Sequence, residues 1–146
     1  MNENDEVKQK YTPPDWLETP TSQLIWTALE YAQTKPSIAV IYGGAGIGKT
    51  KTAYRYMHAH TSKYSDRSSV YIVTAHPSTC TVTSILAAID EATGGAGDVN
   101  AYRSDHMFRS IVRRFSPHDL LIIDEAQYLK KEAIQQVRAL HDEAHI

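Results

Sequence analysis

Apolar residues recur along the chain at two spacings, and these alternate between predicted strands and predicted helices. Three short apolar runs predict strands at 38–42, 70–73 and 120–123, and the continuous apolar character of the last is typical of a strand buried on both faces. Five longer segments carry apolar residues three and four positions apart, which predicts helices at 20–35, 49–60, 79–92, 102–115 and 130–143. Strands that alternate with helices favour an α/β fold, in which helices cover both faces of a parallel sheet.

Each predicted helix has an apolar face that we expect to point into the core. Thr19 suits the N-cap of the first helix, Pro20 its first helical position, and Pro36 its end. The residues expected to face inward are Leu24, Ile25, Ala28, Leu29 and Ala32 in the first helix, Ala53, Tyr56 and Met57 in the second, Val82, Ile85, Leu86 and Ile89 in the third, and Ile134, Val137 and Leu140 in the last.

The first predicted strand leads directly into a glycine-rich loop with the pattern G-x-x-x-x-G-K-[ST]. Its residues are Gly43, Gly44, Ala45, Gly46, Ile47, Gly48, Lys49 and Thr50. Glycines let backbone N–H groups approach phosphates closely, and the following helix directs its positive N-terminal end to the same point. We expect Lys49 to lie beside the β- and γ-phosphates of a nucleoside triphosphate, and the Thr50 hydroxyl to coordinate Mg²⁺. The strand before the loop and the helix after it disfavour an incidental glycine-rich turn.

Two acidic residues follow the third predicted strand. Open α/β sheets place ligands at the carboxyl ends of their strands, which is where Asp124 lies. We expect Asp124 to hold hydrated magnesium and Glu125 to act as the general base that polarises the attacking water. Alone, the pair is equally consistent with acids that cap a turn before a helix. Together with the glycine-rich loop, it indicates a catalytic role for Lys49 and Glu125.

Composition and charge limit the number of domains, the kind of DNA contact and the cellular location that we expect for this protein. The 146 residues suit one domain, and the formal net charge of -2 means that contact with DNA requires a local basic patch. The single cysteine, Cys80, excludes an intramolecular disulfide and is expected to be buried or half-buried. No apolar run approaches the roughly 20 residues that span a bilayer, so we expect a cytoplasmic protein without a membrane partner. Residues 1–15 are expected to form a polar tail and residues 16–146 the domain.

Basic residues form two groups, each open to two interpretations. Arg109, Arg113 and Arg114 fall on the fourth predicted helix. With Arg103 they form either a stripe for the phosphate backbone of DNA or an ordinary solvated face. Lys51 and Arg55, which follow the glycine-rich loop, have the same ambiguity.

Two further sets of residues carry weaker signals. Trp16 and Leu17 precede the first helix and suit either contact with an adenine ring or plain core packing. His58 and His60 are two positions apart and point away from each other on a helix, which disfavours a metal site there.

Five segments outside the glycine-rich loop also follow a recognisable family pattern. They read LETPT at 17–21, QLIWT at 23–27, SIAV at 37–40, VTAHPS at 73–78 and IIDEAQYL at 122–129. Together with the loop they resemble the MuB family, the AAA+ target-selection ATPases of Mu-type transposable phages. The nucleotide motifs are generic to AAA+ proteins, so the segments before the first strand discriminate best.

The resemblance implies a P-loop NTPase fold of the AAA+ type, with ATP and Mg²⁺ as cofactors. It places Lys49 and Thr50 at the phosphates and magnesium, Asp124 at magnesium, and Glu125 beside the attacking water. In this family, ATP-bound protein forms filaments on DNA with little sequence preference and recruits and stimulates a transposase. The expected partners are therefore DNA, a transposase and further copies of the chain.

The family pattern extends beyond this chain at both ends. It usually includes an N-terminal helix-turn-helix domain, and it continues past Ile146 into a sensor strand, an arginine finger and a helical lid. We therefore expect a partial AAA+ domain, truncated before the strand that lies between the loop strand and the Asp124 strand. Unpaired backbone groups on the two facing strand edges predict marginal stability, unless those strands pair directly.

Three other functions stay open. A nucleotide-binding module that assembles on DNA without hydrolysis fits a chain without an arginine finger, which we expect to bind ATP with little turnover. The chain also suits an inactive remnant of a truncated gene. The last alternative is an AAA+ ATPase of another lineage, of the origin-recognition or signalling type.

Overall fold

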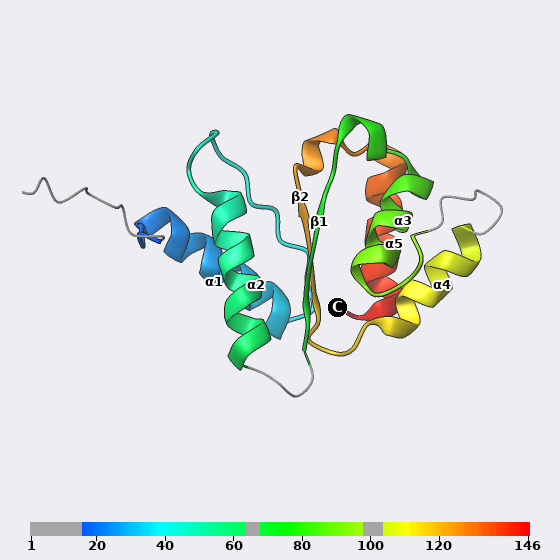
Figure 1. Cartoon of the computed structure of the whole chain (residues 1–146), viewed down its shortest axis with the longest axis horizontal. Helices are drawn as coiled ribbons and strands as arrows, with labels where there is room; N and C mark the ends of the chain where they lie inside the picture. Colours follow the sequence, from blue (N-terminus) through cyan, green and yellow to red (C-terminus); the bar gives the residue numbers. More distant parts are fainter. Residues whose placement is uncertain (1–15, 64–67, 98–103) are drawn as a thin grey trace, which may run out of the picture.

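The computed structural model describes residues 16–63, 68–97 and 104–146. Two parallel strands lie between two groups of helices, with α1 and α2 on one face and α3, α4 and α5 on the other (Figure 1). The helices are α1 (Pro20–Thr34), α2 (Lys49–Lys63), α3 (Val82–Ala92), α4 (Ser104–Arg114) and α5 (Lys131–Ala144). The strands are β1 (Val70–Thr74) and β2 (Leu120–Asp124), and short 3-10 turns occupy η1 (Pro77–Thr79) and η3 (Ala126–Tyr128). This is the predicted α/β architecture.

The two strands pair in parallel along their whole length, from Val70 opposite Leu120 to Thr74 opposite Asp124. Asp119 joins their starting ends, because its carboxylate accepts the backbone N–H of Ser69 at 2.6 Å and that of Ser116 at 2.8 Å. Both strands therefore end at the same edge, which brings Asp124 to the carboxyl end of the sheet.

One helical layer packs on the sheet through α1 and α2. Its buried residues are Ile25, Leu29, Ala32, Tyr56, Val70 and Leu120. Tyr56 is fully buried, and its hydroxyl donates to the side-chain oxygen of Gln33 at 2.6 Å. The Gln33 amide in turn donates to the carbonyl of His118 at 3.0 Å, which ties α1 to the loop before β2.

The other layer packs α3, α4 and α5 against the opposite face. Its buried residues are Val73, Ile85, Leu86, Ala87, Ile89, Met107, Ile111, Phe115, Ala133, Leu140 and Ile146. Neighbouring strand residues alternate between the layers, since Val70 joins the first cluster and Tyr71 packs on the second. A sheet buried on both faces explains why the strands read as continuous apolar runs.

Helix positions largely match the sequence prediction. Thr19 caps α1 as expected, accepting the N–H of Ser22 at 3.1 Å, and Pro20 is the first helical residue. The third helix begins at Val82 rather than at 79, because the Thr81 hydroxyl accepts the N–H of Ser84 and caps it there. Residues 102 and 103 and the proposed tail, 1–15, lie outside the described residues.

Two predicted core residues face solvent. Leu24 is 74% exposed, because α1 buries the stripe of Ile25, Leu29 and Ala32, which runs along a different side of the helix. Ile134 is 53% exposed for the same reason, since α5 buries Ala133 and Leu140. The other predictions for these helices are confirmed where the structure buries the residue, since Ile25, Leu29 and Ala32 in α1 and Leu140 in α5 belong to the core.

The prediction of a strand at 38–42 is wrong for the described structure. The segment is not hydrogen-bonded into the sheet, and Val40 and Tyr42 are 80% and 90% exposed. Only Ile41 packs on the α1–α2 layer. Extended backbone becomes a strand only when a neighbour satisfies its N–H and C=O groups, and no described segment pairs with this one. The segment 38–42 also does not pair directly with β2, the strand that ends at Asp124, which is the arrangement expected to relieve the unpaired strand edges.

The lengths and hydropathy of the helices show whether any of them could cross a membrane. Within the described ranges, none is both long and apolar enough to cross a bilayer.

Candidate nucleotide-binding site

The glycine-rich loop connects the extended segment 38–42 to α2 and has the backbone conformation that its glycines permit. Gly46 and Gly48 have φ angles of 78° and 93°, in the left-handed region that side chains disfavour. Helical hydrogen bonding begins at once, since the Thr52 N–H donates to the Gly48 carbonyl at 2.9 Å. The loop N–H groups and the positive end of a 15-residue helix therefore lie together, as an anion site requires.

Lys49 folds back over the loop that precedes it. Its ammonium donates to the carbonyl of Gly43 at 2.9 Å and to that of Gly44 at 2.8 Å. These contacts hold a positive charge at the mouth of the loop, and a phosphate oxygen is a stronger partner for an ammonium than a carbonyl.

Thr50 and Asp124 are far apart in the sequence but in contact in the structure. The Thr50 hydroxyl donates to Oδ2 of Asp124 at 2.7 Å, across 74 positions of sequence. The other carboxylate oxygen, Oδ1, accepts the backbone N–H of Glu125 at 3.0 Å. The start of α2 and the carboxyl end of β2 thus meet at the two residues that the sequence predicts as magnesium ligands.

Glu125 occupies an unusual backbone conformation directly after β2. Its φ and ψ angles are 55° and 33°, a left-handed geometry that costs a non-glycine residue about 1–3 kcal/mol. The side-chain amide of Gln127 donates to Oε2 of Glu125. Gln127 has no role predicted from the sequence, although a side-chain amide two positions after an acid at a turn is a usable signal.

The donor set suits a magnesium–triphosphate group. A hydroxyl and a carboxylate lie in contact, and Mg²⁺ prefers oxygen ligands of these kinds. Backbone N–H groups and an ammonium are suited to the phosphates. Thr50 and Glu125 are exposed, and Lys49 and Asp124 are half-buried, so the site is open to solvent.

The structure also places the residues for which the sequence left two interpretations or a weaker prediction. The guanidinium of Arg55 lies 5.2 Å from the ring centroid of Trp16, a cation–π contact between α2 and the segment before α1. Leu17 is 72% exposed, so the core-packing interpretation is wrong for this residue. Cys80 is half-buried, as expected.

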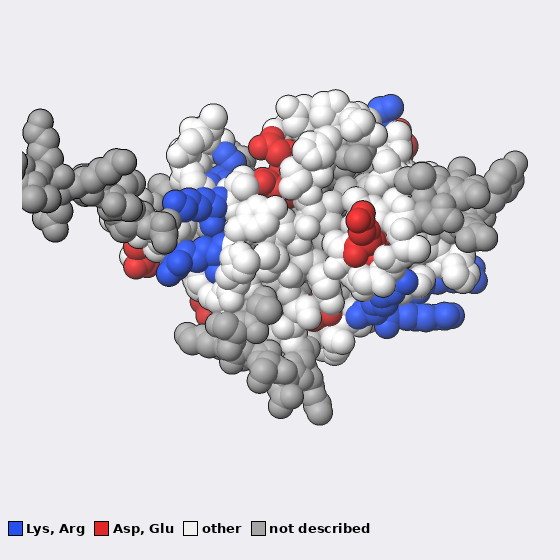
Figure 2. All heavy atoms as spheres, in the orientation of Figure 1, with Lys and Arg blue, Asp and Glu red and all other residues white. Residues whose placement is uncertain are grey.

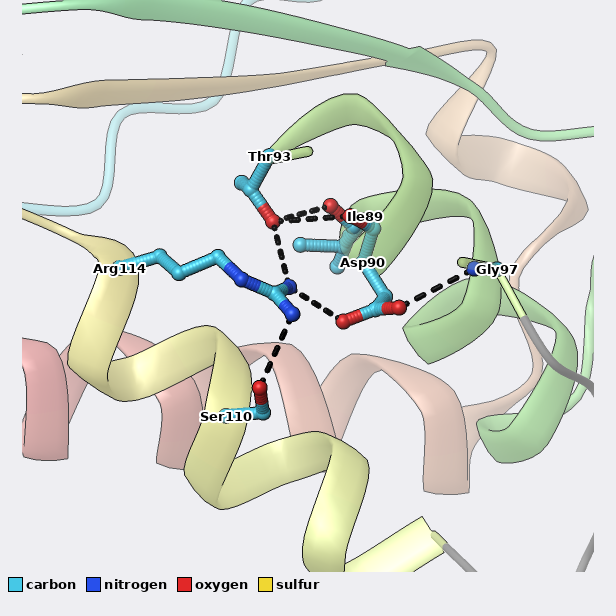
Figure 3. A network of polar contacts seen from close by, with 6 residues as sticks. All are labelled: Ile89, Asp90, Thr93, Gly97, Ser110 and Arg114. Carbon is cyan, nitrogen blue, oxygen red and sulfur yellow. Dashed lines mark hydrogen bonds and ion pairs between the residues drawn. The ribbon is translucent and has the colours of Figure 1, made fainter. Parts of the chain in front are cut away.

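The arginines of α4 do not form a single stripe. Arg114 points toward α3 and pairs with the buried Asp90, while its second nitrogen donates to Ser110 at 3.0 Å (Figure 3). Arg109 and Arg113 are exposed, and Arg103 lies outside the described residues. The predicted group therefore separates into one structural arginine and two surface arginines.

Comparison with known families identifies the domain. A profile described as an AAA domain matches residues 32–146, which include the loop, Asp124 and Glu125. The chain belongs to the AAA domain family. The predicted fold class is thereby confirmed, and membership of the AAA domain family implies nucleotide binding.

Individual relatives are transposition proteins. The chain is 34% identical over 134 residues to the Mu-like prophage FluMu DNA transposition protein B of Haemophilus influenzae, covering 91% of this chain and 44% of that protein. It is 32% identical over 136 residues to the ATP-dependent target DNA activator B of Escherichia phage Mu, covering 92% and 40%. The activator B of Escherichia phage D108 is 33% identical over 132 residues, covering 89% and 39%. The resemblance to the MuB family is confirmed, and the chain spans less than half the length of these relatives.

Proposed function

We propose that this AAA domain binds ATP with magnesium and acts in DNA transposition. In its ATP-bound form it would bind duplex DNA with little sequence preference, associate with further copies of itself and recruit a transposase. The observation that carries the proposal is the 2.7 Å contact between Thr50 and Asp124, which unites the loop with the carboxyl end of β2. The names of two relatives, ATP-dependent target DNA activators, support the coupling to DNA.

Each site residue has a distinct role in this proposal. Lys49 exchanges its two carbonyl partners for phosphate oxygens, while Thr50 and Asp124 hold the metal. Bound magnesium neutralises charge on the phosphates. Glu125 accepts a proton from the attacking water through its carboxylate, one oxygen of which also accepts the amide of Gln127.

A second candidate is a nucleotide-binding assembly module without turnover. The contact between Glu125 and Gln127 favours it, because it occupies one of the two carboxylate oxygens that could otherwise accept a proton from water. Both candidates predict ATP-dependent DNA binding, and they differ only in hydrolysis.

The test combines DNA binding with ATPase measurement on the parent chain, Lys49→Ala and Glu125→Gln. We expect magnesium–ATP to strengthen binding of the parent to duplex DNA and to have no such effect on Lys49→Ala. Glu125→Gln keeps the ATP response in either case, and a fall in its ATPase rate selects the hydrolytic candidate. Equal DNA binding by the parent with and without ATP would overturn the proposal.

A further inference from the structure

Helix α4 has one face in the core and an opposite face that carries positive charge. Met107 and Ile111 are buried, whereas Arg109 and Arg113 are exposed one helical turn apart. At 1.5 Å rise per residue, these two arginines are separated by about 6 Å along the helix axis. We call this pair the α4 arginine face.

The charges of the α4 arginine face are available to a partner. Across the described ranges, neither Arg109 nor Arg113 forms an ion pair, even though Asp105 precedes Arg109 by four positions. Figure 2 shows Lys and Arg atoms gathered on the lower right, over the region where Figure 1 places α4, and projecting into solvent. The contrast is Arg138 on α5, whose guanidinium lies 4.0 Å from the carboxylate of Asp142.

A buried polar network holds α4 in the orientation that exposes this face. Asp90 of α3 is 6% exposed, and it accepts Arg114 on one oxygen and the N–H of Gly97 at 3.1 Å on the other (Figure 3). Ser110 and Thr93 complete the surroundings of the Arg114 guanidinium. Because Arg114 fixes the last turn of α4 against α3, Arg109 and Arg113 project from a rigid helix, and fewer degrees of freedom are lost when they bind.

The partner that fits is a regular array of phosphates. Arginine binds phosphate through two parallel N–H groups, and duplex DNA presents phosphates continuously along its backbone. The other basic group, Lys51 and Arg55, is next to the nucleotide loop, and Arg55 is engaged with the Trp16 ring. The α4 arginine face lies on a different helix from that group and from the nucleotide loop, so it can take a separate ligand.

We infer that Arg109 and Arg113 contact the phosphate backbone of duplex DNA. The inference rests on the proposed function, since it locates the DNA contact that this function requires. Two arginines that read only phosphates predict binding with little preference for sequence.

The test is the salt dependence of binding to a duplex of about 30 base pairs with magnesium–ATP, a length that spans roughly three helical turns. The logarithm of DNA affinity falls as the logarithm of salt concentration rises, and each lost phosphate contact reduces the magnitude of this slope by about 0.9. Each lost contact also weakens binding roughly eightfold near 0.1 M salt. The double variant Arg109→Ala/Arg113→Ala should lose about 1.8 of the slope and roughly 60-fold in affinity. Arg138→Ala, an exposed arginine on another helix, should leave both unchanged, and Arg109→Lys/Arg113→Lys should restore the slope.

The outcomes separate this inference from the function on which it rests. If the parent binds DNA in response to ATP and the double alanine variant has the same slope, the inference is wrong while the proposed function stands. If the parent does not bind duplex DNA, both are wrong. Unchanged DNA binding with lost transposase binding would show that the face takes an acidic protein partner instead.

Discussion

Replacing Arg114 with alanine should destabilise the domain, although arginine-to-alanine changes on exposed helix faces are usually neutral. Asp90 is 6% exposed, and without Arg114 the Gly97 N–H is the one hydrogen-bond donor to its carboxylate among the described residues. Removing one member of a buried ion pair costs about 3–5 kcal/mol. The Arg114 side chain is 32% exposed, so water replaces part of the lost interaction and we expect a loss of about 2–3 kcal/mol.

Urea unfolding followed by far-ultraviolet circular dichroism measures this change. With a slope of about 2 kcal/mol per molar urea, the midpoint should fall by roughly 1 M. Arg113→Ala is the matched control, because Arg113 is the adjacent, exposed residue on the same helix, and it should change stability by less than about 0.5 kcal/mol.

A double-mutant cycle with Asp90→Ala isolates the contact itself. The coupling energy between positions 90 and 114 should be about 1.5–3 kcal/mol, because both residues belong to one hydrogen-bonded network. The reasoning is refuted if Arg114→Ala and Arg113→Ala have equal midpoints, or if the cycle gives a coupling near zero.

Substitutions at three other places test the remaining architecture by urea unfolding. Tyr56→Phe leaves the buried Gln33 oxygen without its 2.6 Å donor and should cost about 1–3 kcal/mol; a neutral result would mean that water reaches this amide. Asp119→Ala removes two backbone contacts at the start of the sheet and should cost about 3 kcal/mol, with Asp119→Asn intermediate; equal stability of both variants and the parent would contradict that role. Val40→Thr/Tyr42→Ser should change stability by less than about 0.5 kcal/mol while reducing light scattering from aggregates, and a larger loss would show that this segment is buried in solution.

Motif residues were predictable from sequence because short-range geometry dictates their positions. A loop with glycines at 46 and 48 and a helix beginning at Lys49 has few alternative conformations. The carboxyl end of β2 is likewise set by its apolar run, which places Asp124 at the sheet edge. The contact of Asp124 with Thr50 follows once the strand and the helix pack in the usual α/β manner.

The failures arise where a residue's environment depends on distant neighbours. Leu24 has the helical spacing of a core residue, but which stripe of α1 is buried depends on how α2 packs against it. Arg114 differs from Arg113 by a rotation of 100° about the helix, and only the position of Asp90 on α3 distinguishes them.

The segment 38–42 shows the same dependence at the level of secondary structure. Its apolar, β-branched composition is typical of a buried strand, yet it exposes Ile38, Val40 and Tyr42. Strand propensity describes suitability for pairing, and pairing requires a neighbour. Its unpaired backbone also leaves the prediction of marginal stability in place, with the free energy of unfolding as the quantity to measure.

Isothermal titration with magnesium–ATP tests the central claim, that residues 43–50 and Asp124 form one nucleotide site. The parent should bind one equivalent, and Lys49→Ala should bind at least tenfold more weakly, a difference of about 1.4 kcal/mol. Asp124→Ala should reduce the effect of magnesium on affinity, whereas Arg138→Ala should behave as the parent. Equal affinity of Lys49→Ala and the parent, or no saturable binding by the parent, would contradict the account.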